Sequence, residues 1–174
     1  DRDLRVFDII METEFGTTYN SYVVKGTEKT ALIETAKAKF CEEYLEKVKA
    51  VTEIDKIDYL IVDHTEPDHA GSAEKLLELN SEIEVIGTTG ALNFLSQIMN
   101  KPFKSRAVKD GEELDLGGKT LRFLVVPNLH WPDTMYTYLP EDKVLFTCDS
   151  FGSHYCCEGI LRSKVENEEG YQRA

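Results

Sequence analysis

The chain has 174 residues, of which 41% are hydrophobic and 30% are charged, values typical of one globular domain with its own core. Its formal net charge of −12 argues against nucleic acid or an anionic membrane surface as a partner. The sequence shows neither an 18-residue apolar run nor a signal peptide, so no membrane span is expected. Four cysteines without a Cys-x-x-Cys pair predict a reduced, cytoplasmic protein.

The first hundred or so residues alternate between strands and helices. The run at 59–62 is continuously apolar, as in a strand that is buried on both faces. Apolar residues from Phe40 to Val51 recur with the period of a helix, which predicts one buried stripe that includes Val51. In chain order we expect strands at 19–24 and 30–33, a helix at 37–51, a strand at 59–62, a helix at 73–79, a strand at 85–86 and a helix at 91–99.

The second part of the chain favours hairpins. Strands are expected at 113–116 and 120–126 around Gly117 and Gly118, and at 136–139 and 144–146 around a turn that begins with Pro140. The acidic tail at 158–174 shows no element of its own. Hairpins at both ends with strand–helix units between them predict a mixed α/β domain in which helices cover sheets.

The segment 63–72 holds the densest group of metal-binding side chains. In an extended backbone alternate residues point to the same side, so His64, Glu66 and Asp68 are expected to converge. Pro67 keeps the preceding residue extended, and His69 begins the turn into the next helix. Two imidazoles and two carboxylates so close together predict a metal site.

Two other segments supply the same residue types. His130 and Asp149 each follow an apolar strand, as His64 does, and α/β sheets place their sites at such strand ends. The combined set therefore predicts one site for two metal ions, with Asp149 as the natural bridge. Its many oxygen donors favour iron over zinc, although the residues alone leave both metals open.

Several segments resemble the flavodiiron proteins, also called A-type flavoproteins. The main one carries a His-x-Glu-x-Asp-His signature in place of the His-x-His-x-Asp-His of the wider metallo-β-lactamase superfamily. The segments are His64-Thr65-Glu66-Pro67-Asp68-His69-Ala70-Gly71-Ser72, Leu129-His130-Trp131-Pro132-Asp133-Thr134-Met135, Asp149-Ser150-Phe151-Gly152 and Gly16-Thr17-Thr18-Tyr19-Asn20-Ser21-Tyr22. The resemblance implies an αββα sandwich with mixed sheets, of which residues 1–174 would be an N-terminal and incomplete part.

The resemblance also implies a non-haem diiron oxidoreductase that reduces dioxygen to water, nitric oxide to nitrous oxide, or both. By position, one iron would be held by His64, Glu66 and His130. The other would be held by Asp68 and His69, although some family members leave the equivalent of His69 unbound. Asp149 would bridge the two irons.

Further expectations come from the rest of the family's architecture. The family has a C-terminal flavodoxin-like domain that binds FMN, which these residues do not include, and a rubredoxin-like or flavin electron donor. Its head-to-tail homodimer brings FMN near the iron of the other subunit, and Trp131 could line that approach. The family also has a further histidine ligand, well after the position of Asp149. His154 is the only later histidine here, and it stands too close to Asp149 to match that ligand.

Two other interpretations remain open from the sequence. One is a dinuclear zinc hydrolase of the metallo-β-lactamase superfamily, against which Glu66 argues because hydrolases usually have histidine there. The other is a non-catalytic fragment with an incomplete site, which the missing later histidine supports.

Overall fold

The computed structural model describes residues 1–159 and 162–174. The chain forms two compact units. The larger unit runs from Tyr19 to Ser150, and the smaller unit combines Asp1–Thr18 with Phe151–Ala174. No helix among the described residues is long and apolar enough to cross a membrane.

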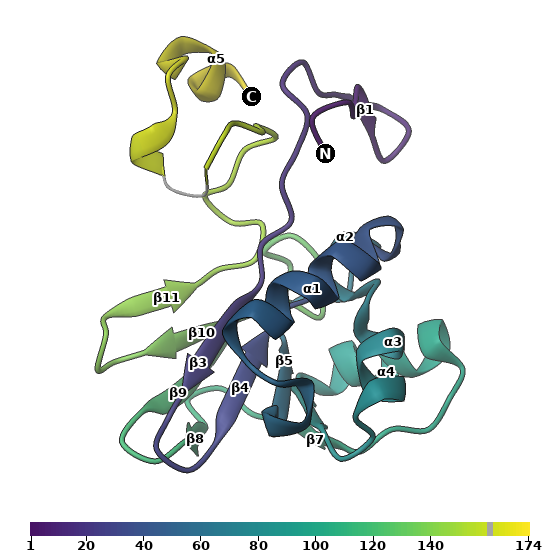
Figure 1. Ribbon diagram of the computed structural model, residues 1–174, viewed down its shortest axis with the longest axis vertical. Coiled ribbons are helices and arrows are strands. Elements are labelled where there is room, and N and C mark those ends of the chain that lie inside the picture. Colours follow the sequence, from purple (N-terminus) through teal and green to yellow (C-terminus); the bar gives the residue numbers. More distant parts are fainter. Residues whose placement is uncertain (160–161) are drawn as a thin grey trace. The chain divides into compact units, whose positions relative to one another are not determined.

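Two sheets form the centre of the larger unit (Figure 1). The five-stranded sheet has the order β3 (Tyr22–Lys25), β4 (Thr30–Ile33), β5 (Tyr59–Val62), β6 (Glu84–Gly87) and β7 (Ser105–Ala107). In this sheet β3 is antiparallel to β4, and the other pairs are parallel. The second sheet is antiparallel, with the order β11 (Val144–Phe146), β10 (Met135–Leu139), β9 (Thr120–Val125) and β8 (Glu113–Asp115).

Alternating side chains of the five-stranded sheet build two cores. Leu32, Leu60 and Val85 pack against helices on one face, while their neighbours Ile61 and Ile86 pack against the second sheet on the other. The described part of this unit therefore has three layers, helix, sheet and sheet, of the four in an αββα sandwich (Figure 1). The helical elements of this unit are η1 (Ala38–Phe40), α1 (Cys41–Val51), η2 (Ile54–Lys56), α2 (Pro67–Ala70), α3 (Ala73–Leu79) and α4 (Thr89–Met99).

The expected strands and helices of this unit are present, with shifted ends. The helix expected from residue 37 begins as the 3₁₀ turn η1, and Val51 at its end is exposed rather than part of the buried stripe. The sequence patterns missed the short elements η2, α2 and β7. The expectation of an extended backbone through Asp68 was wrong, because Pro67 takes the first position of α2, where its fixed φ suits a helix.

The described residues of the smaller unit form four short elements. They are β1 (Val6–Phe7), β2 (Met11–Glu12), η3 (Arg162–Lys164) and α5 (Glu168–Arg173). The expectation that the tail at 158–174 forms no element was therefore wrong, although residues 160 and 161 of it lie outside the described residues. Asn167 caps α5 by accepting a hydrogen bond from the backbone N–H of Gly170, and a six-residue helix is too short to show a periodic pattern.

His154 lies in the smaller unit, where it is partly buried. Its ring packs on Phe7 with 4.7 Å between ring centroids, and Nδ1 lies 3.1 Å from Oγ1 of Thr17. These contacts give His154 a packing role within its own unit. All four cysteines of the chain are free thiols.

Candidate metal centre

The side chains singled out in the sequence lie beyond the ends of three strands. His64 follows β5 by two residues, and Asp149 follows β11 by three. His130 lies in the connection between β9 and β10. Because these strands belong to two packed sheets, their ends bring the three segments to one place.

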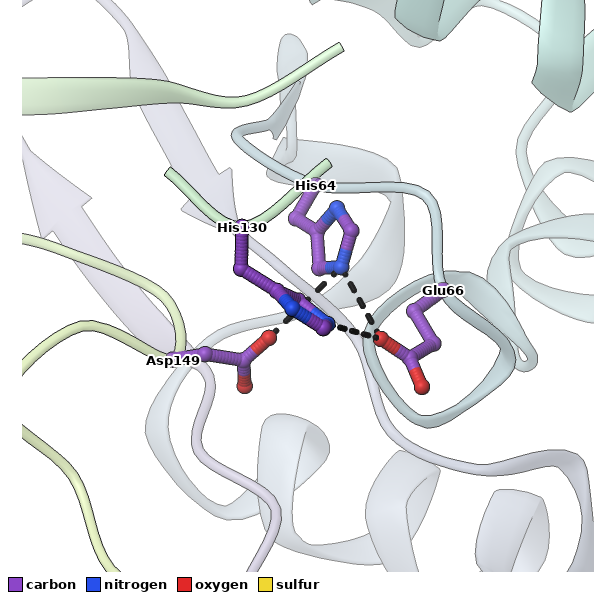
Figure 2. A group of neighbouring side chains, drawn as sticks. All are labelled: His64, Glu66, His130 and Asp149. Carbon is purple, nitrogen blue, oxygen red and sulfur yellow. Dashed lines mark hydrogen bonds and ion pairs between the residues drawn. The ribbon is translucent and has the colours of Figure 1, made fainter. Parts of the chain in front are cut away.

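The first group comprises His64, Glu66, His130 and Asp149 (Figure 2). Oε2 of Glu66 lies 3.1 Å from Nε2 of His64 and 3.3 Å from Nε2 of His130. Oδ2 of Asp149 lies 3.5 Å from Nε2 of His64. One potential ligand atom from each of the four residues falls within 4.8 Å of all the others, a spacing that suits one metal ion.

A second group comprises Asp68, His69 and Asp149. Nε2 of His69 lies 2.7 Å from Oδ1 of Asp149 and 3.6 Å from Oδ2 of Asp68. Asp149 therefore belongs to both groups and faces one histidine of each with a different oxygen. The structure thus brings together all six predicted ligand residues, in two groups joined by one carboxylate.

The six side chains differ in exposure. His64 and Glu66 are almost fully buried, with 1% and 6% of their side chains exposed. Asp149 is 40% exposed and His130 is 59% exposed. The segment after β5 thus forms the floor of the site, while the loops after β9 and β11 form its open side.

The donor atoms fit metal ions, and two observations favour a cation at this position. Oδ1 of Asp68 is buried and has no hydrogen-bond partner among the described residues, and burial raises the pKa of this carboxyl. Burial acts to lower the pKa of His69, but the charge of Glu34 and hydrogen bonds with Asp149 and Glu34 raise it to about 11. The carboxylates around His69 therefore favour a positive charge at this position, which a metal ion would supply.

Two buried carboxylates support the histidines from behind, and the sequence patterns missed both. Oε2 of Glu34 lies 2.6 Å from Nδ1 of His69, and Oδ2 of Asp133 lies 3.5 Å from Nδ1 of His64. Glu34 directly follows β4, a strand-end position like that of the predicted ligands, and this signal could have revealed it. Asp133 follows no strand, so its role depends on the fold.

Asp133 also fixes the backbone beside His64. Its Oδ2 accepts hydrogen bonds from the backbone N–H of Thr65 at 2.9 Å and from Oγ1 of Thr65 at 2.7 Å. Burial opposes the charge of Asp133, but the neighbouring ring of His64 and the hydrogen bonds from Thr65 lower the pKa of its carboxyl. Burial likewise acts to lower the pKa of His64, whereas the nearby carboxylate of Asp133 and the hydrogen bond with Glu66 raise it.

Trp131 covers part of the first group. Its ring meets His64 edge to face, with 5.1 Å between centroids and an interplanar angle of 81°. The ring centroids of Trp131 and His130 are 6.3 Å apart. Trp131 therefore shields the buried histidine.

Comparison with known proteins identifies the family. A protein-family model described as "ODP family beta lactamase" matches residues 17–170. The chain belongs to this family, whose members include the β-lactamase-like domains of the flavodiiron proteins. It is 45% identical over 173 residues to flavo-diiron protein FprA2 of Clostridium acetobutylicum, covering 98% of this chain and 43% of that protein. Over 162 residues it is 48% identical to diflavin flavoprotein A 1 of Synechocystis, covering 92% of this chain and 28% of that protein.

Solved flavodiiron structures have the same fold. The flavodiiron protein of Giardia intestinalis superposes with a TM-score of 0.91 at 33% identity, covering 98% of this chain and 41% of that one. Rubredoxin oxygen:oxidoreductase of Desulfovibrio gigas gives a TM-score of 0.92 at 32% identity, covering 98% and 42%. The metallo-β-lactamase-like α/β fold is thus confirmed, and the chain spans less than half the length of these relatives.

Proposed function

We propose that this chain forms the iron-binding part of a diiron oxidoreductase that reduces dioxygen to water, nitric oxide to nitrous oxide, or both. The observation that carries the proposal is the position of Asp149, whose two oxygens face His64 and His69 at 3.5 and 2.7 Å. A carboxylate shared in this way suits two metal ions. Membership of the flavodiiron family supports iron as the metal.

In this proposal each group of side chains holds one iron. His64, Glu66 and His130 would hold the first, Asp68 and His69 would hold the second, and Asp149 would serve both. Bound iron would supply the electrons for reduction and the position at which the gas binds. The oxygen-rich ligand set suits a metal that changes its oxidation state, because carboxylates are hard, anionic donors.

The protein's own contribution is to hold these donors in place. Glu34 and Asp133 lie behind Nδ1 of His69 and His64, which leaves both Nε2 atoms on the side of the bridging carboxylate. Trp131 keeps water from one face of His64. The exposed loops that carry His130 and Asp149 leave a small gas molecule access to the site.

The remaining parts of the reaction would come from outside these residues. We propose that electrons arrive from FMN in a flavodoxin-like domain, or from a rubredoxin-like donor, and that a cytoplasmic head-to-tail homodimer brings the flavin close to Trp131. The relative from Desulfovibrio gigas is named for such an electron donor and for dioxygen, which supports this choice.

Metal content tests the proposal directly. The full-length protein, purified without oxygen and without added zinc, should contain close to two irons per chain. His154→Ala is the matched control, since His154 packs on Phe7 in the smaller unit and should not affect iron content. Zinc in place of iron would favour the hydrolase, and loss of iron from His154→Ala would show that the ligand set is wrong.

A further inference from the structure

The two ring nitrogens of His69 have different surroundings. Nδ1 lies 2.6 Å from Oε2 of the buried carboxylate Glu34. Nε2 lies 2.7 Å from Oδ1 of Asp149 and 3.6 Å from Oδ2 of Asp68. One nitrogen therefore faces the protein interior, while the other faces the carboxylates of the second group.

Glu34 is held firmly in place by its own contacts. Its Oε1 accepts hydrogen bonds from the backbone N–H groups of Asp63 at 2.6 Å and His64 at 3.2 Å. Its backbone carbonyl accepts one from Oγ of Ser21 at 2.8 Å, and its backbone N–H donates to Ile61 at 2.9 Å. The side chain therefore has a fixed direction towards His69.

The backbone conformation of Glu34 indicates that this direction matters. Its φ of +59° lies in the left-handed region, which costs free energy for a residue with a side chain. Glu34 is also only 3% exposed, so its carboxylate loses most of its hydration. The strained backbone and the buried carboxylate of Glu34 persist because the surrounding hydrogen bonds hold them. The carboxylate contacts Nδ1 of His69.

The chemistry of a carboxylate then fixes the proton on the ring. Both oxygens of an ionised carboxylate accept hydrogen bonds and neither donates, so Nδ1 of His69 must be the donor. With one N–H held at Nδ1, the ring presents the lone pair of Nε2 to a cation that displaces any proton on that nitrogen. We propose that Glu34 is a positioning residue that keeps the ring proton of His69 on Nδ1 and so directs Nε2 towards Asp68 and Asp149. The consequence for metal binding rests on the diiron site proposed above.

Glu34→Gln tests this role sharply because the amide can sit in only one good orientation. The two backbone N–H groups at Oε1 select the amide oxygen, so the amide NH₂ faces Nδ1 of His69. Nδ1 must then accept, the ring proton moves to Nε2, and Nε2 loses its lone pair. Supporting residues of this kind change metal affinity roughly 10- to 100-fold, so we expect a loss of that size for the second iron.

The experiment uses the full-length protein and two measurements. In the metal-free protein, the ¹⁵N chemical shifts of the His69 ring should show Nδ1 with its proton in the wild type and without it in Glu34→Gln. Anaerobic titration with ferrous iron should then show that the second equivalent binds roughly 10- to 100-fold more weakly in the variant, while the first changes little.

Three comparisons keep the result specific. Asp63→Asn makes the same change from acid to amide at an equally buried position that faces Thr137, and it should still bind two irons. In a His69→Ala background, Glu34→Gln should cause no further loss of the second iron. If Glu34→Gln does not fold, the wild-type spectrum still decides, because an unprotonated Nδ1 overturns the proposal.

The two proposals can fail separately. A wild type that binds fewer than two irons refutes the diiron function. The role of Glu34 is then decided by the ¹⁵N shifts of the metal-free protein alone. A Glu34→Gln variant that keeps the proton on Nδ1 overturns the positioning role, even if the wild type binds two irons.

Discussion

The six proposed ligands divide into a buried half and an exposed half. The buried half is the segment from His64 to His69, which supplies four of the six side chains within one stretch of chain. The exposed half consists of His130 and Asp149, each on a separate loop. Glu34 and Asp133 support the histidines of the buried half, whereas the ring of His130 is mostly open to solvent.

This difference separates two ways of building a site. The buried half is fixed by the same hydrogen bonds that complete the core at the end of β5, so its geometry forms with the fold. The exposed half has few such constraints, so bound metal would contribute most to fixing it. Changes in the buried half should therefore affect folding, while changes in the exposed half should affect mainly metal binding.

The largest effect on metal is expected from Asp149→Ala. This change removes the side chain common to both groups, so iron content should fall from two per chain towards none. Reduction of gas should fall more than about 100-fold, because loss of a supporting residue alone costs roughly 10- to 100-fold. Elemental analysis and turnover of the full-length protein measure both effects. Asp142→Ala, on the surface beside Lys119, is the control and should keep both irons.

The pH dependence of the metal-free protein should reveal the charge on His69. Its pKa is raised from 6.5 in the unfolded chain to about 11, since the charge of Glu34 and hydrogen bonds with Asp149 and Glu34 outweigh burial. This stabilisation is complete below about pH 6.5 and is lost as the pH rises through about 11. Urea unfolding of chelator-treated protein should therefore show stability falling over this range. An equally steep fall in His69→Gln would contradict this assignment.

A smaller effect, on folding, is expected from Asp133→Ala in the support of the buried half. The change leaves the backbone N–H and the hydroxyl of Thr65 without their shared acceptor. An unsatisfied buried polar group costs about 1–3 kcal/mol, so the free energy of unfolding of the metal-free protein should fall by that amount.

His130→Ala is the matched change in the exposed half. Its ring is 59% exposed, so the free energy of unfolding of the metal-free protein should stay within about 0.5 kcal/mol of the wild type. Binding of the first iron should nevertheless weaken. Equal losses of stability in His130→Ala and Asp133→Ala would remove the distinction between the two halves.

The sequence predicted much of the fold and the residues that gather at the candidate site, because both depend on short-range patterns. The apolar run of β5 and the period of α1 are local features, and His64, His130 and Asp149 each stand beyond a strand end. Pro67 keeps Glu66 extended as predicted, but the backbone at Asp68 was misread because the same proline also begins α2. Asp133 could not be predicted, since its contact with Thr65 joins residues 68 positions apart.

The shared side chain Asp149 has a consequence for how the protein takes up metal. If one carboxylate serves both proposed positions, the two binding equilibria would be thermodynamically linked: an ion that orders Asp149 at one position would change the affinity of the other, and the effect would be reciprocal. If the first ion aligns Asp149 for the second, uptake is cooperative. A sample given half its full complement of iron would then be chiefly a mixture of empty and doubly loaded molecules, with few that carry a single ion.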